Sequence, residues 1–518
     1  MILKLFLLIT LLYVTSIQTA NILALFPSSS RSHFIVFQPL LEKLAERGHQ
    51  VDVLSHFPRK QSLNGYTDLS VRGDEKYYSF YIDFETVKSL SFREILTVMN
   101  YNCGVNICKS IKNNTALQNL MSSKKHYDLI ITEIFVSDCL IGFANIFNAP
   151  VIGMTSSVNL PWTSDLIGLP DNPSYIPNYF SPYTEDMTFY EKILNTIVLH
   201  LTKTWHKYYP NDETNKFIQE MFGRNTPHVD ELRKNVSLVM VNSHFSIQQS
   251  RPLPPNFIEI GGIHLKSNPV LPKEFENYME TDLKGVIYLS FGTLFKSEMF
   301  PDYKLKPFFE ALSKIPYKIL WKGKRSDVNK HLNIPTNIHF VPWAPQSEIL
   351  CHPNLKLFIS HCGLASAQEA IYCGKPVLSM PVWVDQLSTA KIISHKGLGL
   401  TIPLLQDFTK EKLSNVLHQL LENPKYTENA RRLSELFRDR LTSPLDTAVY
   451  WTEYIIRHKG APHLTSKAAD LSFYEYYCFD IAVSFVLVTL ILVWSFYKVL
   501  KKILSVRIHF KVSKSKLS

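Results

Sequence analysis

The sequence has few charged residues and few cysteines for its length, and both shortages narrow the class of protein. Charged residues make up 19% of the 518 residues and hydrophobic residues 46%, which argues against a disordered chain or one that coats nucleic acid. The seven cysteines include no CxxC pair, so a structural zinc site is not expected and scattered buried thiols are predicted. Cys103 and Cys108 are the one pair that we single out as able to bridge.

Acidic residues are missing altogether from the last 21 residues, and this absence explains most of the net charge. Seven lysines and arginines lie in that tail, so of the formal net charge of +10 about +3 belongs to the rest of the chain, an ordinary value for a globular protein. The positive charge is therefore a property of the tail, and no nucleic-acid partner is expected.

The run Ile481–Tyr497, directly before this tail, contains no charged residue. Its 17 residues span about 25 Å as a helix, the short end of what a bilayer core requires, and Trp494 and Tyr497 suit a membrane interface. We predict a transmembrane helix at 479–498 and a basic cytoplasmic tail at 499–518, with a buried core helix as the alternative. The positive-inside rule then places the body of the protein in the lumen.

Residues 1–20 have the layout of a secretory signal peptide: a charge at Lys4, an apolar middle and a small residue, Ala20, at the predicted cut. The alternative is a buried strand or helix at the start of the first domain. A lumenal body fits the two N-glycosylation sequons at Asn113 and Asn235.

The C-terminal Lys514 and Lys516 resemble a di-lysine signal that returns type I membrane proteins to the endoplasmic reticulum. We therefore expect a single-pass type I protein of the endoplasmic-reticulum membrane.

Strands alternate with helices in two parts of the chain. Ile22–Phe26 precedes a helical pattern that Gly48 ends, and Val51–Leu54 follows as a strand. The alternation restarts at Val286–Phe291, after a proline-rich stretch. Further strands are predicted at Asp128–Thr132, Val151–Thr155, Ile319–Trp321, Ile338–Val341, Leu357–Ser360 and Val377–Met380, and a helix is predicted at 445–458.

The pattern predicts an α/β fold with two Rossmann-like domains facing a cleft. We expect an N-terminal domain at 21–250, a linker at 251–284 and a C-terminal domain at 285–475. In such sheets ligands bind at the carboxyl ends of the strands.

Donor groups and a helix follow the strand that ends at Ser360. His361 leads into a turn and a helix at 363–372, whose free N–H groups and dipole make an anion site. His361 and Ser366 can add side-chain donors, and Glu369 can accept from a diol such as a ribose. Glu369 alone, on an amphipathic helix, would usually be a surface acid; together these residues predict an anion site.

Trp343, Asp385 and Gln386 flank this segment. Trp343 offers a flat face for a base, and the acid–amide pair lies where several hydroxyl groups could be held. The alternative for Trp343 is a core position, which is the more frequent one for a tryptophan.

The stretch 343–386 resembles the sugar-nucleotide signature of the UDP-glycosyltransferase family, the UDP-glucuronosyl- and UDP-glucosyltransferases. The rest of the chain resembles the membrane-bound animal branch of that family, especially its insect members, through the passages 32–34, 44–49, 258–262, 289–293 and 444–451. The resemblance implies a GT-B fold, a UDP-sugar donor, a small lipophilic acceptor, no cofactor or metal, and inversion of the anomeric centre. It leaves open a homo-oligomer.

The resemblance also implies roles for single residues. Trp343 would stack on uracil, Gln346 would hold the nucleoside, Glu369 would bind the ribose, and Asp385 and Gln386 would hold the transferred sugar. Six residues would surround the diphosphate: Ser290, Gly292, Thr293, His361, Gly363 and Ser366.

His33 matches the general base of the family, and a nearby acid would orient its imidazole. Asp138 is the preferred acid because aspartate is the residue type of the family, and Glu133 is the other candidate. Cys362 and Thr389 depart from the family's pattern and could alter how the sugar is held, so the sequence defines the donor sugar less closely than it defines the class of enzyme. UDP-glucose is expected and UDP-glucuronate is the alternative. A catalytically inactive member that binds lipophilic ligands, or a transferase that uses another nucleotide sugar, remains open.

Overall fold

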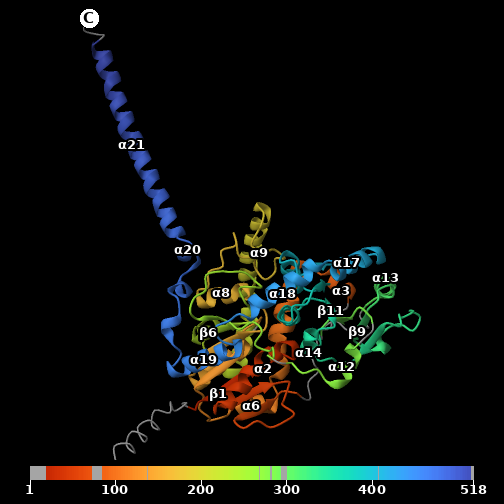
Figure 1. The fold of residues 1–518 in the computed structure, drawn as a ribbon. Helices are drawn as coiled ribbons and strands as arrows, with labels where there is room; N and C mark the ends of the chain where they lie inside the picture. Colours follow the sequence, from red (N-terminus) through yellow and green to blue (C-terminus); the bar gives the residue numbers. More distant parts are fainter. Residues whose placement is uncertain are drawn as a thin grey trace, which may run out of the picture. The chain divides into compact units, whose positions relative to one another are not determined.

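Two parallel β-sheets organise the chain up to Thr465 (Figure 1). The computed structural model describes residues 19–72, 84–136, 138–267, 269–280, 283–292, 300–406 and 408–514. The predicted signal peptide lies outside the described residues except for Thr19 and Ala20. The predicted α/β fold with two facing sheets is confirmed.

The first sheet has the strand order β3-β2-β1-β4-β5-β6-β7, all parallel. Its strands are β1 (Asn21–Phe26), β2 (Gln50–Ser55), β3 (Tyr66–Ser70), β4 (Leu129–Glu133), β5 (Val151–Thr155), β6 (Val236–Val241) and β7 (Phe257–Glu259). The central strands β4 and β5 are buried at every residue because helices cover both faces, and continuous apolar runs are typical of such strands.

The second sheet has the order β10-β9-β8-β11-β12-β13, again all parallel. Its strands are β8 (Val286–Ser290), β9 (Lys318–Lys322), β10 (Ile338–Val341), β11 (Leu355–Ser360), β12 (Val377–Ser379) and β13 (Gly399–Thr401). The strands missed from the sequence are β3, β6, β7 and β13. Of these, β7 and β13 have three residues each, too few to show a pattern.

Helices connect the strands. Those before β8 are α2 (Arg31–Glu46), α3 (Phe84–Ser89), α4 (Phe92–Thr97), the π-helix η1 (Val98–Val105), α5 (Asn106–Ile111), α6 (Thr115–Met121), η2 (Cys139–Ile141), α7 (Gly142–Phe147), α8 (Pro161–Ile167), α9 (Phe189–Tyr208), α10 (Pro210–Phe222), α11 (Val229–Leu232), η3 (Arg233–Asn235) and α12 (Lys273–Met279). Those after it are α13 (Asp302–Leu312), η5 (Arg325–Asp327), α14 (Gln346–Cys351), α15 (Leu364–Tyr372), α16 (Val384–His395), α17 (Lys410–Glu422), α18 (Pro424–Arg438), α19 (Pro444–Arg457), η6 (Pro462–Leu464), η7 (Lys467–Asp470), α20 (Phe473–Tyr476) and α21 (Phe479–Lys514).

Two disulfides correct the prediction of scattered thiols. Cys108 bonds to Cys139 and Cys351 bonds to Cys373, whereas Cys103 is a free thiol, so the pair singled out from the sequence is wrong. The sequence separations are 31 and 22 residues. Only folding brings these partners together, and spacing along the chain therefore gave no signal.

The chain returns to the first sheet after completing the second. Helix α19 packs on α2: Ile455 and Ala448 belong to the same core as Phe37 of α2. Arg47, at the end of α2, donates two hydrogen bonds to Glu453, at 2.6 and 3.1 Å. The expected linker at 251–284 also belongs in part to the first sheet. It contains β7, which pairs with β6, and Phe257 of β7 is buried in the core of that sheet.

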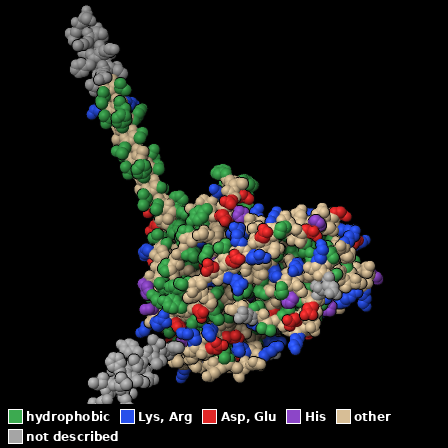
Figure 2. Space-filling model, in the orientation of Figure 1, with side chains coloured by type: hydrophobic (Ala, Val, Ile, Leu, Met, Phe, Trp, Pro, Cys, Tyr) green, Lys and Arg blue, Asp and Glu red, His purple; other side chains and the backbone are tan. Residues whose placement is uncertain are grey.

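Residues from Ser466 onward form a second compact unit. Its helix α21 includes a candidate membrane span, Phe479–Ser505, of 27 residues, in which an 18-residue window has a mean hydropathy of 2.3 and no buried residue. Figure 2 shows hydrophobic side chains along this helix. At 1.5 Å per residue the span is about 40 Å long, enough to cross a bilayer core with some tilt.

Replacing Ile455 by alanine should lower the free energy of unfolding by about 2–5 kcal/mol, because the side chain is fully buried between α19 and the first sheet. Tyr450→Ala on the exposed face of α19 is the control and should change it by less than about 1 kcal/mol. Urea unfolding of the detergent-solubilised protein measures both. Equal effects would contradict the docking of α19.

Candidate active site

Each sheet has one point where the strand order reverses, and the candidate residues gather at these two points. In the first sheet β1 lies between β2 and β4, and in the second β8 lies between β9 and β11. Loops leave such neighbouring strands in opposite directions, so the carboxyl ends there are open to ligands. His33 follows β1 and Glu133 ends β4, while Ser290 ends β8 and His361 follows β11.

His33 and Glu133 form a hydrogen-bonded pair. Nδ1 of His33, in the first turn of α2, donates to Oε1 of Glu133 at 2.6 Å, and the imidazole edge packs on Phe135. The hydroxyl of Ser156, which the sequence analysis missed, also donates to Oε1 of Glu133, at 3.4 Å. The preference for Asp138 is corrected: its carboxylate accepts from Nε of Arg233 at 2.5 Å. Glu133 is the acid that contacts His33 because it ends β4, which pairs with β1, whereas Asp138 lies in the loop after β4.

The surroundings of His33 raise its pKa above the ordinary 6.5. Burial by itself lowers the pKa, but the charge of Glu133 and its hydrogen bond outweigh burial, and the charge of Asp385 adds to them. The same interaction with His33 lowers the pKa of Asp385, whereas burial, the larger effect, raises it. The charge of a residue that follows β12 of the second sheet thus acts on a residue that follows β1 of the first.

The loops after β8 and β11 fit together tightly. A Cβ on Gly292 would lie 2.6 Å from Cε1 of His361, and one on Gly363 would lie 2.8 Å from Nε2, so both positions require glycine. Nδ1 of His361 is buried and has no hydrogen-bond partner among the described residues. Burial lowers the pKa of His361 to about 4, so its imidazole is neutral. Thr293 lies outside the described residues.

Cys362 has a left-handed backbone, with φ +64°. This conformation costs a residue with a Cβ about 1–2 kcal/mol and costs glycine little. Glycine would adopt this turn without that cost. The buried thiol packs in the core under α15.

Gln346, Ser366 and Glu369 form a network on α14 and α15. Nε2 of Gln346 donates to Oγ of Ser366 at 2.8 Å and to a carboxylate oxygen of Glu369, and Ser347 donates to the other oxygen at 2.8 Å. Burial raises the pKa of Glu369, and these hydrogen bonds partly offset the shift. Trp343 is 66% exposed, so its ring is available to a ligand.

Lys322 ends β9 beside this network, and the sequence analysis missed it. Burial lowers the pKa of Lys322 and the charge of Glu369 partly restores it, while Lys322 in turn lowers the pKa of His361. The charge of Lys322 therefore acts on His361 and interacts with that of Glu369, both of which lie in the segment after β11. The position at the end of a strand next to the reversal point was the signal that could have identified it.

Asp385 and Gln386 begin α16. The side-chain oxygen of Gln386 accepts from the backbone N–H groups of Val382 and Trp383, at 2.9 and 3.0 Å, and so caps the helix. The hydroxyl of Thr389 donates to the backbone oxygen of Asp385, one turn earlier in α16, at 2.9 Å. Of this acid–amide pair, Asp385 is the residue whose charge acts on His33.

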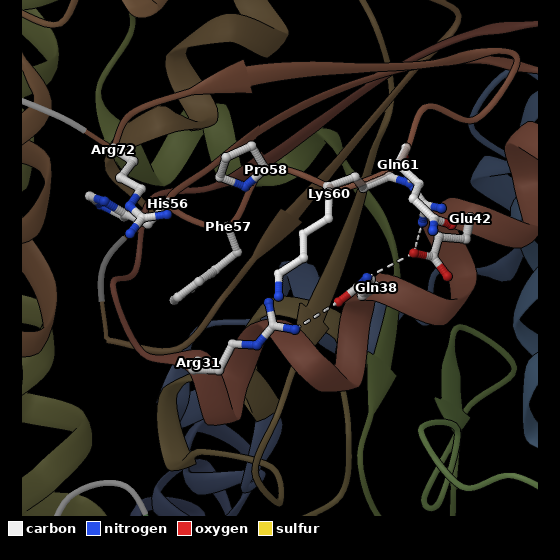
Figure 3. A pocket seen from close by; sticks show the side chains of 10 residues that line it. Arg31, Gln38, Glu42, His56, Phe57, Pro58, Lys60, Gln61 and Arg72 are labelled. Atoms are coloured by element: carbon white, nitrogen blue, oxygen red, sulfur yellow. Dashed lines mark hydrogen bonds and ion pairs between the residues drawn. The ribbon is translucent and has the colours of Figure 1, made fainter. Parts of the chain in front are cut away.

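A cavity of about 690 Å³ lies beside α2 and the segment after β2 (Figure 3). Four cations line it: Arg31, Arg59, Lys60 and Arg72. His33 is two residues from Arg31, about 200° around the helix, and is not among the lining residues. This basic cavity is therefore separate from the His33 site. Among the described residues no group of three His, Cys, Asp or Glu side chains could hold a metal ion.

Two facing Rossmann-like sheets, with a strand–turn–helix anion site in the second, define a GT-B glycosyltransferase that uses a nucleotide sugar. The model for "UDP-glucoronosyl and UDP-glucosyl transferase" matches residues 22–515, and the chain belongs to this family.

Relatives from insects and mammals cover nearly the whole chain. The UDP-glycosyltransferase UGT5 of Dactylopius coccus is 37% identical, covering 91% of this chain and 90% of its own. UDP-glucosyltransferase 2 of the same insect is 34% identical, with 98% of each chain covered. UDP-glucuronosyltransferase 1A9 of Mus musculus is 32% identical over 87% of this chain and 86% of its own.

Solved structures share the fold. The spinosyn forosaminyltransferase SpnP has a TM-score of 0.57 at 18% identity, covering 85% of this chain and 100% of its own. At this identity the likeness concerns the fold alone.

Lys322→Met should weaken binding of UDP by roughly tenfold to a hundredfold, since a hydrogen bond to a charged group contributes about 1.5–3 kcal/mol. Lys318→Met is the matched control, because Nζ of Lys318, at the other end of β9, donates to the backbone oxygens of Tyr278 and Glu280. Calorimetric titration with UDP measures both variants. Equal affinities of the Lys322 variant and the unchanged protein would remove Lys322 from the nucleotide site.

Proposed function

We propose that the protein is an inverting transferase that moves glucose from UDP-glucose to a hydroxyl group of a small lipophilic acceptor. The observation that carries the proposal is the His33–Glu133 pair with Asp385 acting on it from the second sheet. A base and a sugar-binding carboxylate then lie where an acceptor and a donor would meet.

His33 is proposed as the general base. Because Nδ1 of His33 donates to Glu133, Nε2 keeps its lone pair and can accept the proton of an acceptor hydroxyl. The acceptor oxygen forms a bond to the anomeric carbon while the bond from that carbon to the diphosphate oxygen breaks. The electron pair leaves with UDP, the proton stays on His33, and attack opposite the leaving group inverts the centre.

The groups around β8 and β11 are proposed to hold the leaving diphosphate. The N-terminus of α15 supplies a positive dipole end, the neutral His361 can donate a hydrogen bond, and Lys322 supplies a charge. Gly292, Gly363, Ser290, Ser366 and Thr293 complete the proposed diphosphate set. Gln346 and Glu369 are proposed for the nucleoside and ribose, Trp343 for the base, and Asp385 with Gln386 for the sugar.

The charges near Asp385 favour a neutral sugar. In the described part of the chain, the groups that shift the pKa of Asp385 are backbone amides and His33, and none is a lysine or arginine. The carboxylate of a glucuronate would be repelled by Asp385 without a compensating cation. UDP-glucuronate remains the alternative because relatives of both kinds match the chain.

We also propose that the body lies in the lumen of the endoplasmic reticulum and that α21 anchors it there. Two disulfides suit an oxidising compartment. Asn113 and Asn235 are both exposed, as glycan attachment requires.

His33→Ala should lower kcat by roughly 10²- to 10⁴-fold, the usual contribution of a general base, with little change in affinity for UDP. Release of UDP with a panel of phenolic and steroid acceptors measures turnover. If the His33→Ala variant turned over as fast as the protein without substitution, the assignment of His33 would be refuted. If the protein without substitution released no UDP with any acceptor and donor sugar, a catalytically inactive binding protein would be favoured.

The pH profile should report the His33–Glu133 pair. Since the neutral imidazole is the base and Glu133 raises its pKa, kcat/KM should rise with pH through an apparent pKa above 6.5. Glu133→Gln removes that charge, so the rise should shift to lower pH and kcat should fall. Asp138→Asn is the control and should leave the apparent pKa in place, because Asp138 pairs with Arg233. An identical shift in both variants would contradict the pairing.

The donor preference can be measured directly. We expect kcat/KM for UDP-glucose to exceed that for UDP-glucuronate at least tenfold, because no lysine or arginine of the described residues shifts the pKa of Asp385 and could offset a second carboxylate. Asp385→Asn should narrow the ratio. A preference for UDP-glucuronate in the unchanged protein would overturn the assignment of glucose.

A further inference from the structure

The cavity beside α2 has a strongly basic lining that the transfer reaction does not use. Arg31, Arg59, Lys60 and Arg72 line it together with a single acid, Glu42. That acid already forms an ion pair with Arg59. Four cations against one carboxylate leave the lining with a net charge of +3.

Arg31 has no acidic partner among the described residues. Its Nη2 donates a long hydrogen bond of 3.4 Å to Oε1 of Gln38, and its guanidinium lies 5.1 Å from the centre of the Phe57 ring. Burial lowers the pKa of Arg31, and the interaction that opposes this shift is with Tyr66 rather than with a carboxylate. A partly desolvated guanidinium is therefore left without a counter-charge, and an anion in the cavity would supply one.

Lys60 and Arg72 add two exposed cations that form no ion pair with an acid in the part of the chain that the structure describes. In Figure 3 the side chains of Arg31 and Lys60 extend toward each other, one from α2 and one from the segment after β2. Like charges that converge in this way repel each other, and a bound anion turns the repulsion into attraction. The arrangement favours a ligand that carries more than one negative charge.

The cavity is larger than a simple inorganic anion requires. Its volume of about 690 Å³ lies within the range of about 300–1,000 Å³ that is typical of sites for small organic ligands. Phe57 and Pro58 give it apolar surface, and the amide of Gln61 can pair with a polar group of a ligand. The lining therefore suits an organic molecule with a charged group at one end.

We propose that this cavity binds a small organic phosphate as a second ligand besides the UDP-sugar. A guanidinium binds phosphate oxygens through two parallel N–H bonds, and a net charge of +3 matches a phosphate dianion better than a single carboxylate. None of the residues assigned to the transfer reaction lines the cavity. The proposal therefore stands independently of the transferase function.

The test is a calorimetric titration of the full chain in detergent with phenyl phosphate, in the presence of saturating UDP so that the nucleotide site is occupied. We expect binding that weakens with added salt, and Arg31→Gln and Lys60→Gln should each lower the affinity roughly tenfold or more. Lys43→Gln is the matched control and should leave the affinity unchanged. Lys43 also belongs to α2, but it pairs with Glu46 and does not line the cavity.

The affinity of each variant for UDP is measured in a separate titration and should equal that of the protein without substitution, which shows that the fold is intact. Benzoate has the same ring with one carboxylate and should bind more weakly than phenyl phosphate. Four results would overturn the proposal: no binding of phenyl phosphate at millimolar concentration, equal affinities of the Arg31, Lys60 and Lys43 variants, benzoate bound as tightly as phenyl phosphate, or a parallel loss of UDP affinity in the Arg31 and Lys60 variants. None of these measurements requires turnover, so failure of the proposed transferase function would be seen separately.

Discussion

The electrostatic interaction between His33 and Asp385 is the constraint on which the catalytic arrangement depends. His33 belongs to a helix of the first sheet and Asp385 to a helix of the second, so neither sheet contains the site alone. Contacts elsewhere hold the two sheets together. Gln368 of α15 is buried, donates to the backbone oxygen of Asn242 at 2.9 Å and accepts from the N–H of Gly262 at 3.2 Å. The helix whose N-terminus is proposed to face the diphosphate is thus fixed to the sheet that carries His33.

Burial lowers the pKa of both histidines of the site, but neighbouring charges shift the two pKa values in opposite directions. His33 has a carboxylate partner, so its pKa is raised and it can take up a proton during the reaction. His361 has no carboxylate partner among the described residues and lies near Lys322, so its pKa is lowered to about 4 and it stays neutral. A base is needed beside the acceptor and a neutral donor beside the phosphates. The environment of each ring, rather than the residue type, assigns these tasks.

Much of the fold could be predicted from the sequence because the signals are local. Val151–Thr155 and Ile338–Val341 were predicted with the bounds that the strands have, since apolar runs of four or five residues between turns indicate buried strands. The turn at Gly363 and the helix that follows it were also predicted from the sequence. The short strands β7 and β13 and the disulfide partners were not, because they depend on neighbours far away in the chain.

The sequence by itself determined the alternation of strands and helices, the apolar C-terminal helix and the family, since each depends on local pattern or on a continuous motif. The tertiary structure decided which acid meets His33. Glu133 and Asp138 are five residues apart and chemically alike, and only the adjacency of β1 and β4 selects Glu133. It also decided that α19 returns to the first sheet, where Glu453 binds Arg47, and that α9 turns its isoleucines outward. Sequence periodicity reports that a helix has an apolar face, but only packing against the rest of the chain decides whether that face is buried.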